Sequence, residues 1–553
     1  MNALIAYTTL AGGYCSTAKI VTMALLAVPW LYLSPWIQRD AKRVMAPATA
    51  WASVALAAGA VGMLLWLFIG SFVAGLVVYS LAVAAAGAGY VVYRNQRVDV
   101  EYRILTPDHI RSLMGGGARD KLAVQTLLKV YDTDGKILPP PGDNAPIEQR
   151  RAYNLAQQLL YDILFYRASE ADLSPVGPVG RIRFVVDGAL LARPDLDQAQ
   201  CELVIQHLKG ITGMDPAETR RPQKGSLSVD LASQPIDMVL TTAGTTTGQR
   251  MQFRVVQESI QTRLEDLGIS EDMLDRICEL NAEPTGLLIV SSKPKNGLSS
   301  TLYSLMRRHD AFTKQLIALE AKAASELENV SQNVYGSQDD LAKALASAIR
   351  QEPSVIMVDR CENAEAARLL AEAADKRLIL LGVPADSSLT AMAKWVRAVG
   401  QPTLAMSSLR GIVNQVLIRK LCPECKEGYA PDPAVLTRAN LPLGSTESFY
   451  RPPTGPLLDD KGKAMLDKQG LPIPCPTCGG TGYFGRTGVF ELLEITDEVR
   501  QLVAGGAQLA QIGAACRRSN PRTLQEEALR KVNEGVTSVQ EVIRVTQSKK
   551  KKK

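Results

Sequence analysis

The chain has 553 residues, enough for three or four domains, and its 46% hydrophobic and 21% charged residues are ordinary for a globular protein with a membrane portion. Nine cysteines, four of them in two C-x-x-C pairs, favour a reducing compartment with a metal site and exclude a disulfide framework. The net charge of +6 comes partly from the five lysines of residues 549–553. We expect these lysines to form a disordered end, with anionic lipid or nucleic acid as alternative contacts.

The N-terminal part predicts a membrane domain. Residues 21–37 are apolar over the length of a short transmembrane helix, with Trp30 and Trp36 as interfacial aromatics. Residues 48–93 carry no charge, a length that suits two further spans hinged near Gly70, at about 51–69 and about 72–93. Basic residues follow the first and last spans, so the positive-inside rule places both basic segments in the cytoplasm: Arg39, Lys42, Arg43, Arg94, Arg97 and Arg103. An interfacial or signal-like helix is the alternative for the first segment.

A small α+β domain is expected after a linker. Residues 104–135 predict a short helical piece, and the proline- and glycine-rich segment 136–146 predicts a linker. A helix then begins near Gln149, and Asp187-Gly188 is a hairpin turn signal. Strands are expected at 181–186, 226–231 and 251–256.

Residues 280–420 alternate strand and helix patterns, which predicts a mostly parallel sheet covered by helices, as in nucleotide-binding cores. Strands are expected at 287–290, 354–358 and 377–381, and helices from the first strand to about 317, at 340–350 and at 364–374. In this core the apolar run that ends at residue 290 is followed by a loop and then by a helical pattern. This strand, loop and helix order is the layout of a phosphate-binding P-loop. Gly297 and Ser299 fit the pattern G-x-x-x-x-G-K-[ST], but Ser292 stands at the first glycine and Leu298 at the lysine.

The two C-x-x-C pairs predict a structural metal site. Four thiolates give tetrahedral Zn²⁺ with no open position, and each pair is followed by glycine, as tight turns about a metal require. The ligands would be Cys422, Cys425, Cys475 and Cys478. The other five cysteines have no such partners and are expected to be packing residues: Cys15, Cys201, Cys278, Cys361 and Cys516.

Further stretches match one family's patterns: 479–491 (GGTGYFGRTGVFE), 523–529 with 535–541, 181–188 and 350–358. Over residues 149–546 the chain therefore resembles the secretion and pilus-assembly ATPases of type II secretion systems and type IV pili. That resemblance implies a hexameric ring, in which each subunit has a PAS-like α+β lobe and a RecA-like P-loop α/β core with ATP at the cleft between them. It divides the chain into a membrane domain (1–103), a small helical region with linker (104–148), the PAS-like lobe (149–275), the RecA-like core (276–420), a zinc subdomain (421–490), C-terminal helices (491–548) and the lysine tail (549–553).

The chain departs from this family at its catalytic positions. Leu298 replaces the Walker A lysine, and the Walker B strand, expected to end Gly-Glu, continues as Asp359-Arg360. The acidic box survives only as Glu320, and Pro384 stands at the position of the family histidine, with no histidine beyond His309. In the PAS-like lobe Val239 replaces an arginine, although Arg250 remains.

Phosphoryl transfer depends almost wholly on positioning and electrostatic stabilisation. Losing a phosphate cation and the Walker B carboxylate together would slow the reaction on the order of a thousandfold or more. The first hypothesis is therefore a pseudo-ATPase that serves as scaffold, ring partner or regulator. In the second, an active ATPase, Lys293 or Lys295 reaches phosphate and Asp359 or Glu362 holds Mg²⁺. A third is ATP binding without hydrolysis, at Lys295, Asn296, Gly297, Leu298, Ser299 and Ser300.

The resemblance also implies the location and partners. With three spans, the protein is expected in a bacterial inner membrane, with its main domains in the cytoplasm. Expected partners are copies of itself or of an intact relative in a hexameric ring, the inner-membrane platform proteins of the machine and membrane lipid, but no specific nucleic acid.

Overall fold

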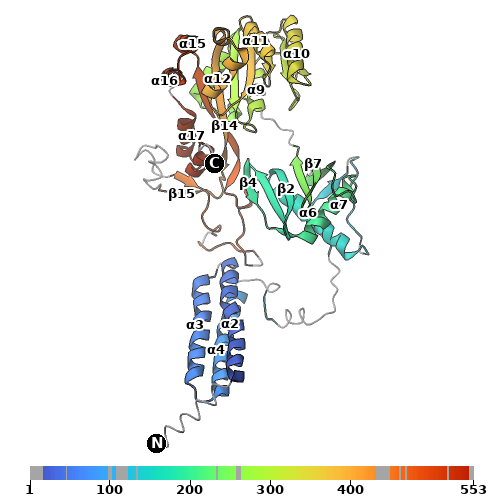
Figure 1. Cartoon of the computed structure of the whole chain (residues 1–553), viewed down its shortest axis with the longest axis vertical. Coiled ribbons are helices and arrows are strands. Elements are labelled where there is room, and N and C mark those ends of the chain that lie inside the picture. Colours follow the sequence, from blue (N-terminus) through green and yellow to red (C-terminus); the bar gives the residue numbers. More distant parts are fainter. Residues whose placement is uncertain are drawn as a thin grey trace, which may run out of the picture. The chain divides into compact units, whose positions relative to one another are not determined.

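The structure is a computed structural model of the whole chain (Figure 1). It describes residues 17–44, 46–96, 103–106, 123–132, 135–142, 144–231, 234–256, 263–430, 449–459, 462–467, 470–519 and 522–546. Two compact units are distinguished, residues 1–121 with 453–476 and residues 122–452 with 477–553. The lysine tail, Cys15 and Arg97 lie outside the described residues.

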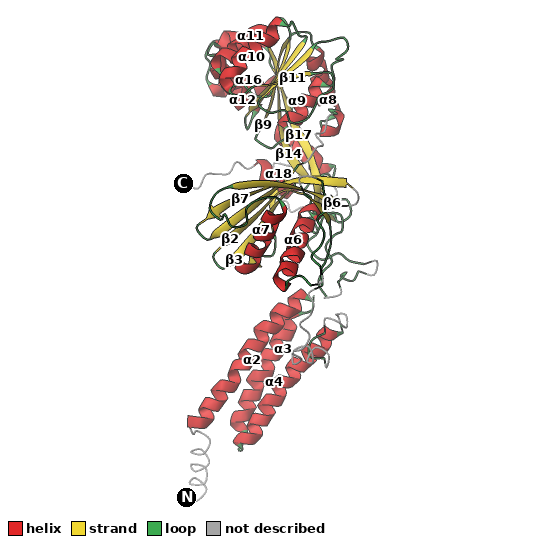
Figure 2. Cartoon of the chain, turned by 90° about the vertical axis from the view of Figure 1, so that its right-hand side faces the viewer, coloured by secondary structure: helices red, strands yellow, loops and turns green. Residues whose placement is uncertain are grey.

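The first unit contains helices α2 (Thr17–Arg43), α3 (Ala48–Phe68) and α4 (Phe72–Asn95), each long and apolar enough to cross a membrane. The three helices pack side by side, as Figure 2 shows. Arg94 near the end of α4 forms an ion pair with Asp40 near the end of α2 at 2.9 Å, and the Tyr90 hydroxyl donates to the same carboxylate at 2.6 Å. The C-terminal ends of α2 and α4 therefore lie together, which is compatible with the expectation that both basic segments are on one side of a membrane.

The predicted helical piece at 104–135 is only partly described. Of its expected helical residues, Leu127 and Leu128 lie in extended chain, and their backbone N–H groups donate to the side chain of Gln157 at 3.0 and 2.8 Å. The helical interpretation is wrong for 123–131, because this segment instead leads into strand β1 (Lys129–Tyr131) at the edge of a sheet. Ile110, Leu113 and Leu122 lie outside the described residues.

The α+β domain is a sheet with helices on one face. Its strands lie in the order β1-β6-β7-β8-β2-β3-β4, with β5 beside β3, and all pairs are antiparallel. The sheet buries alternate apolar side chains, such as Phe184 and Phe253, against helices α6 and α7 (Figure 2). Its other face carries polar side chains. The elements are α6 (Ile147–Phe165), β2 (Ala168–Val176), β3 (Val179–Val186), β4 (Ala189–Ala192), β5 (Leu196–Asp197), α7 (Gln198–Ile211), β6 (Gln223–Leu231), β7 (Gln234–Thr245) and β8 (Gly248–Val255).

The second sheet confirms the predicted parallel core. Its order is β11-β10-β12-β13-β9-β14-β17, parallel except for the β14–β17 pair. Apolar side chains pack α8 and α9 on one face and α10–α13, α15 and α16 on the other. The elements are α8 (Glu271–Ala282), β9 (Gly286–Ser292), α9 (Leu298–Met306), β10 (Leu316–Glu320), β11 (Ser331–Val334), α10 (Gln338–Arg350), β12 (Val355–Val358), α11 (Ala364–Ala373), β13 (Leu378–Pro384), α12 (Ser388–Val399), α13 (Pro402–Ser407), β14 (Leu409–Leu421), β17 (Tyr483–Glu494), α15 (Asp497–Ala504) and α16 (Leu509–Ser519).

One element of the core was mispredicted. The helix expected to continue to about 317 ends at Met306, and the buried strand β10 follows. A turn at Asp310, whose side chain accepts from the Phe312 N–H at 2.9 Å, separates the two. A short buried apolar run cannot be assigned to helix or strand by periodicity alone.

The C-terminal segment packs on the antiparallel end of this sheet. It contains β15 (Glu427–Tyr429), β16 (Phe449–Arg451), α17 (Leu524–Asn533) and α18 (Val539–Thr546). Glu541 of α18 is fully buried and accepts from Arg419 of β14 at 2.7 Å and from Arg544 at 2.6 Å. Burial alone would raise the pKa of Glu541, but these hydrogen bonds outweigh it and lower the pKa to about 2. The ionised carboxylate therefore ties α18 to β14.

Candidate nucleotide and metal sites

The P-loop position has the predicted strand, loop and helix geometry. Gly297 precedes α9 with a φ of +83°, a left-handed conformation that favours glycine. The loop is held from β14, where the Gln415 amide donates to the Asn296 carbonyl at 2.8 Å and accepts from the Thr301 hydroxyl at 2.6 Å. The Leu417 N–H also donates to the Asn296 side chain at 3.0 Å. The loop therefore keeps its shape through contacts within the protein.

Of the three positions expected to place a cation near phosphate, one is a leucine, one is a paired lysine and one is an exposed lysine. Leu298 begins α9 and packs against the apolar cluster beneath that helix. The Lys295 ammonium pairs with Glu170 of β2 at 2.5 Å, so it is directed to the α+β domain. Lys293 is exposed, and Ser299 and Ser300 are half-buried at the start of α9. The structure thus brings the predicted loop residues together, with Leu298 in place of the lysine at the start of α9 and with neither loop lysine at that position.

The two acidic positions lie at neighbouring strand ends. Glu320 ends β10, is buried, and accepts from the Tyr303 hydroxyl at 2.7 Å and from Gln332 at 3.0 Å. Burial raises the pKa of Glu320 above its ordinary value. Asp359 follows β12, and its carboxylate accepts from the Tyr335 hydroxyl and from the Ala321 N–H, the latter at 3.0 Å. Burial and the neighbouring Asp359 carboxylate raise the pKa of Tyr335, so this hydroxyl keeps its proton.

The chain after Asp359 is tied to the start of α10. The Tyr335 hydroxyl also donates to the Arg360 carbonyl at 3.3 Å, and the Arg360 side chain is exposed. Gln338 accepts from the Glu362 N–H at 2.8 Å, and the Asn363 amide donates to Asp339. These contacts hold the segment after β12 against the start of α10.

Pro384 ends β13, the strand between β12 and β9. Its ring occupies the position predicted for the family histidine, and its carbonyl accepts from Lys394. Proline offers no side-chain hydrogen bond, so it cannot sense a phosphate as a polar residue would.

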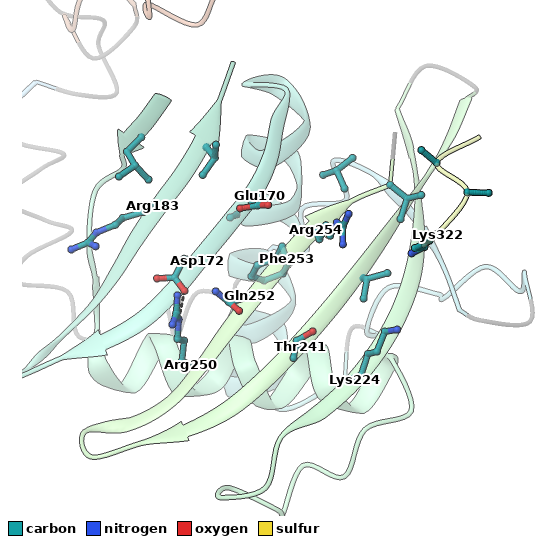
Figure 3. Close-up of a pocket in the computed structure, with 18 residues that line it drawn as sticks. Glu170, Asp172, Arg183, Lys224, Thr241, Arg250, Gln252, Phe253, Arg254 and Lys322 are labelled. Atoms are coloured by element: carbon teal, nitrogen blue, oxygen red, sulfur yellow. Dashed lines mark hydrogen bonds and ion pairs between the residues drawn. The ribbon is translucent and has the colours of Figure 1, made fainter. Parts of the chain in front are cut away.

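A basic cavity lies on the open face of the α+β sheet (Figure 3). The cavity has a volume of about 860 Å³. Arg250, singled out from the sequence, pairs here with Asp172. Four further cations line the cavity and have no carboxylate within ion-pair distance in the described part of the chain: Arg183, Lys224, Arg254 and Lys322. Sequence reasoning missed these four, although the strand residues among them occupy positions that face away from the covered side of the sheet.

The four predicted metal ligands come together. The Sγ atoms of Cys422, Cys425, Cys475 and Cys478 all lie within 4.8 Å of one another and are buried. No disulfide links them in the described chain. The Gly482 N–H donates to the Cys478 Sγ at 3.3 Å, and Gly479 and Gly482 have positive φ, as the turn around these thiols requires. The cluster is a candidate metal centre.

Comparisons with known proteins agree with these features. The family model described as "Type II/IV secretion system protein" matches residues 143–544. The type IV pilus assembly ATPase PilB of Thermus thermophilus is 27% identical over 401 residues, which are 72% of this chain and 43% of that protein. The type II secretion system protein HxcR of Pseudomonas aeruginosa is 28% identical over 73% of this chain and 78% of its own length. The type II secretion system protein E of Pectobacterium carotovorum is 29% identical over 75% and 78%.

Solved structures are also similar. The Legionella pneumophila ATPase DotB aligns with 70% of this chain and 94% of its own at 14% identity and a TM-score of 0.46. The pilus retraction motor PilT with bound ADP aligns with 71% and 97% at 14% identity and a TM-score of 0.40.

Proposed function

Because the chain belongs to the type II/IV secretion system protein family, we propose that it is a membrane-anchored pseudo-ATPase serving a type II secretion or type IV pilus machine as scaffold or regulator. In this proposal residues 149–275 are the PAS-like lobe, residues 276–420 the RecA-like core and residues 421–490 the zinc subdomain. The names of the relatives point to the machine, and the altered catalytic positions argue for the loss of hydrolysis.

One observation carries this proposal. The carboxylate of Asp359, the acid nearest to the Walker B position, accepts hydrogen bonds at both oxygens, from Tyr335 and from the Ala321 N–H. A Mg²⁺ site with nucleotide needs a carboxylate directed to the metal or to its waters. Glu320 is engaged by Tyr303 and Gln332 in the same way. The carboxylates of Asp359 and Glu320 are therefore not directed to a magnesium ion.

The phosphate side of the site supports the same conclusion. Leu298 contributes no charge, and Lys295 neutralises Glu170. Electrostatic stabilisation of the transferred phosphoryl group is the main source of catalysis in phosphoryl transfer. With Leu298 in place of the phosphate lysine and with Asp359 and Glu320 both engaged, a subunit can occupy a place in a ring without hydrolysing ATP.

The metal centre fits zinc as a structural ion. Four buried thiols within 4.8 Å match the tetrahedral all-cysteine donor set of such sites, which leaves no position for substrate. The cysteines would hold the end of β14 to the start of β17. Zinc bound there supplies stability and takes no part in a reaction.

We place the protein in a bacterial inner membrane with its main domains in the cytoplasm. The three apolar helices and the basic residues after α2 and α4 support this topology. Partners in the proposal are copies of the chain or of an intact relative in a hexameric ring, and the platform proteins of the machine.

Nucleotide binding without turnover is the second candidate function. It is favoured by the four unpaired cations that line the cavity of the PAS-like lobe (Figure 3). These cations would attract the phosphates of a nucleotide although Leu298 stands at the position of the phosphate lysine.

The test measures ATP binding and hydrolysis by the full chain in detergent, using calorimetry with and without Mg²⁺. We expect no hydrolysis, and either no binding at millimolar ATP or binding that Mg²⁺ does not strengthen. Turnover that disappears in Lys295→Ala or Asp359→Ala would overturn the proposal and favour the active motor. The same holds for Lys293→Ala, and Lys343→Ala, which changes an exposed lysine of α10, is the control for loss of a surface charge.

A further inference from the structure

Two hairpins between the cysteine pairs repeat a structure found elsewhere in the chain. The first copy is residues 130–138. There the Asp132 N–H donates to the Lys136 carbonyl at 3.0 Å, and the Asp132 carboxylate accepts from the Lys136 N–H at 2.9 Å. The Asp132 carbonyl accepts from the Gly135 N–H at 3.1 Å, and the Leu138 N–H donates to the Val130 carbonyl at 2.8 Å.

Asp459 and Asp467, eight residues apart, make the same four bonds. The sequences agree: V-Y-D-x-x-G-K-I-L in the first copy, L-L-D-x-x-G-K-A-M in the second and M-L-D-x-x-G-L-P-I in the third. Met465 belongs to both later copies, because its N–H donates to the Leu457 carbonyl at 2.8 Å and its carbonyl accepts from the Ile473 N–H at 3.0 Å. The described residues 457–459, 462–467 and 470–473 therefore pair as two successive hairpins that share Met465, called here the tandem hairpin.

The first copy shows how such a hairpin is stabilised. Its first strand is β1, which pairs antiparallel with β6 at one edge of the PAS-like lobe's sheet. Val130 is buried, and Leu138 packs against the core of that lobe. The hairpin thus extends a sheet edge and packs Val130 and Leu138 against the domain that it joins.

The tandem hairpin has apolar residues at the corresponding positions, and they are half-buried or exposed. Leu458 is 61% exposed and Met465 is 41% exposed. None of its large apolar side chains is buried: Leu457, Leu458, Met465, Leu466, Leu471 and Ile473. An isolated two-stranded hairpin is at best marginally stable in water, and a third strand adds stability when the strands share an apolar face. Packing that face on another element would stabilise the tandem hairpin further.

The sheet that receives the first copy has a second, open edge. Within the described residues, β4 pairs only with β3 and ends the strand order opposite β1. This edge strand has the sequence A-L-L-A, and its Leu190 is 75% exposed. An open apolar edge is a site where another strand pairs unless charge or a partner blocks it.

We propose that the tandem hairpin of one copy of this chain adds to the β4 edge of a second copy, as the first hairpin adds to the β6 edge. Exposed apolar side chains on both surfaces would be buried by this pairing. The contact joins two different surfaces of identical chains, so it is heterologous and propagates head to tail into a ring when the rotation closes. The proposal goes beyond the loss of hydrolysis, since it stands whether or not ATP is bound.

The test places a benzoylphenylalanine photo-crosslinker at position 190 of the full chain in detergent. Unlabelled and ¹⁵N-labelled copies are mixed before irradiation. We expect crosslinks to residues 457–473 that include mixed-isotope pairs. Crosslinks confined to a single isotope would mean pairing within one copy, and crosslinks to lipid or to other segments would also overturn the proposal. The same crosslinker at Val176, an exposed residue of β2, controls for contact by collision.

A second measurement uses association. Met465→Lys and Leu190→Lys each place a charge on one of the two surfaces, and each should weaken self-association about tenfold in mass photometry. Ile137→Lys is the matched control, because Ile137 is an exposed residue of the first hairpin. Unchanged association of both variants would overturn the proposal. Unchanged metal content and circular dichroism would establish that the variants fold.

Discussion

Tyr335 and Asp359 form a hydrogen bond that helps to hold the segment after β12 in place. A hydrogen bond between a hydroxyl and a carboxylate contributes about 1.5–3 kcal/mol, and here the same hydroxyl also reaches the Arg360 carbonyl. Removing the hydroxyl leaves the carboxylate with the Ala321 N–H as its remaining partner at this site. The segment that follows β12 should then unfold locally more often.

We therefore expect Tyr335→Phe to speed amide hydrogen exchange at residues 359–363 by about tenfold or more. Asp359→Ala should have a similar effect, and the double variant should add little, because each single variant already removes the Tyr335–Asp359 hydrogen bond. Tyr450→Phe, on the short strand β16, should leave these amides unchanged. Protection of the same amides by Mg²⁺ in the unmodified protein would contradict the assignment, since it would mean that the metal already binds Asp359.

Glu320 makes the core sensitive to pH. Its pKa is raised in the folded protein, so the folded state binds the proton more tightly than the unfolded state does. The stability due to protonated Glu320 is fully present below the ordinary glutamate pKa of about 4.3 and is lost as pH rises through the folded value.

We expect Glu320→Gln to remove this loss of stability at higher pH. The variant should unfold at a higher temperature than the unmodified protein above neutral pH, and the difference should shrink as pH falls towards about 4. Thermal unfolding across this range, followed by circular dichroism, measures the effect. Glu326→Gln is the control on the exposed chain after β10. An unchanged pH profile in Glu320→Gln would mean that the buried carboxyl is not the source of the dependence.

At the scale of the elements, the metal centre connects the two antiparallel strands β14 and β17. The Cys422 N–H donates to the Gly482 carbonyl at 3.0 Å, and the Tyr483 hydroxyl contacts Ser538 at 2.8 Å, just before α18. The cysteine cluster therefore supports both the strand pair and the helix packed on it.

We expect Cys425→Ser to lose about one zinc ion per chain and to make α17 and α18 susceptible to proteolysis. Elemental analysis and limited proteolysis check the two parts. Cys361→Ser, a half-buried cysteine outside the cluster, should change neither. Full zinc content in Cys425→Ser would exclude the cysteine cluster as the site.

Some elements of the fold and site could be predicted from the sequence and others could not. The cysteine ligands were found because their spacing alone defines the donor set, and the parallel core because its strands are continuous buried runs. Strand β7 and the helix end at Met306 were missed, since polar residues and short apolar runs carry no clear period. The partners of Asp359 and Lys295 could not be found, because Tyr335 and Glu170 are brought there by tertiary packing.

At the scale of the whole molecule, the predicted spans and the helices agree closely, with α2 extending further at both ends than residues 21–37. A reporter test decides the topology. We expect alkaline phosphatase fused after Gly70 to be active, because the short connection between α3 and α4 should face the periplasm. A fluorescent protein fused after Asn95 should be fluorescent, because that end should face the cytoplasm. The reverse pattern would mean an inverted membrane domain.

The ion pair between Asp40 and Arg94 has a consequence for biosynthesis. The two residues are 54 positions apart, so at typical rates of translation Asp40 waits roughly 3 to 11 s for its partner. During that time α2 has no neutralising cation from α4, and its charged end must stay in the headgroup region or against the insertion machinery. We therefore expect α2, α3 and α4 to pack together only after α4 has left the ribosome. The domains that follow would then be synthesised on a chain whose three apolar helices are already packed.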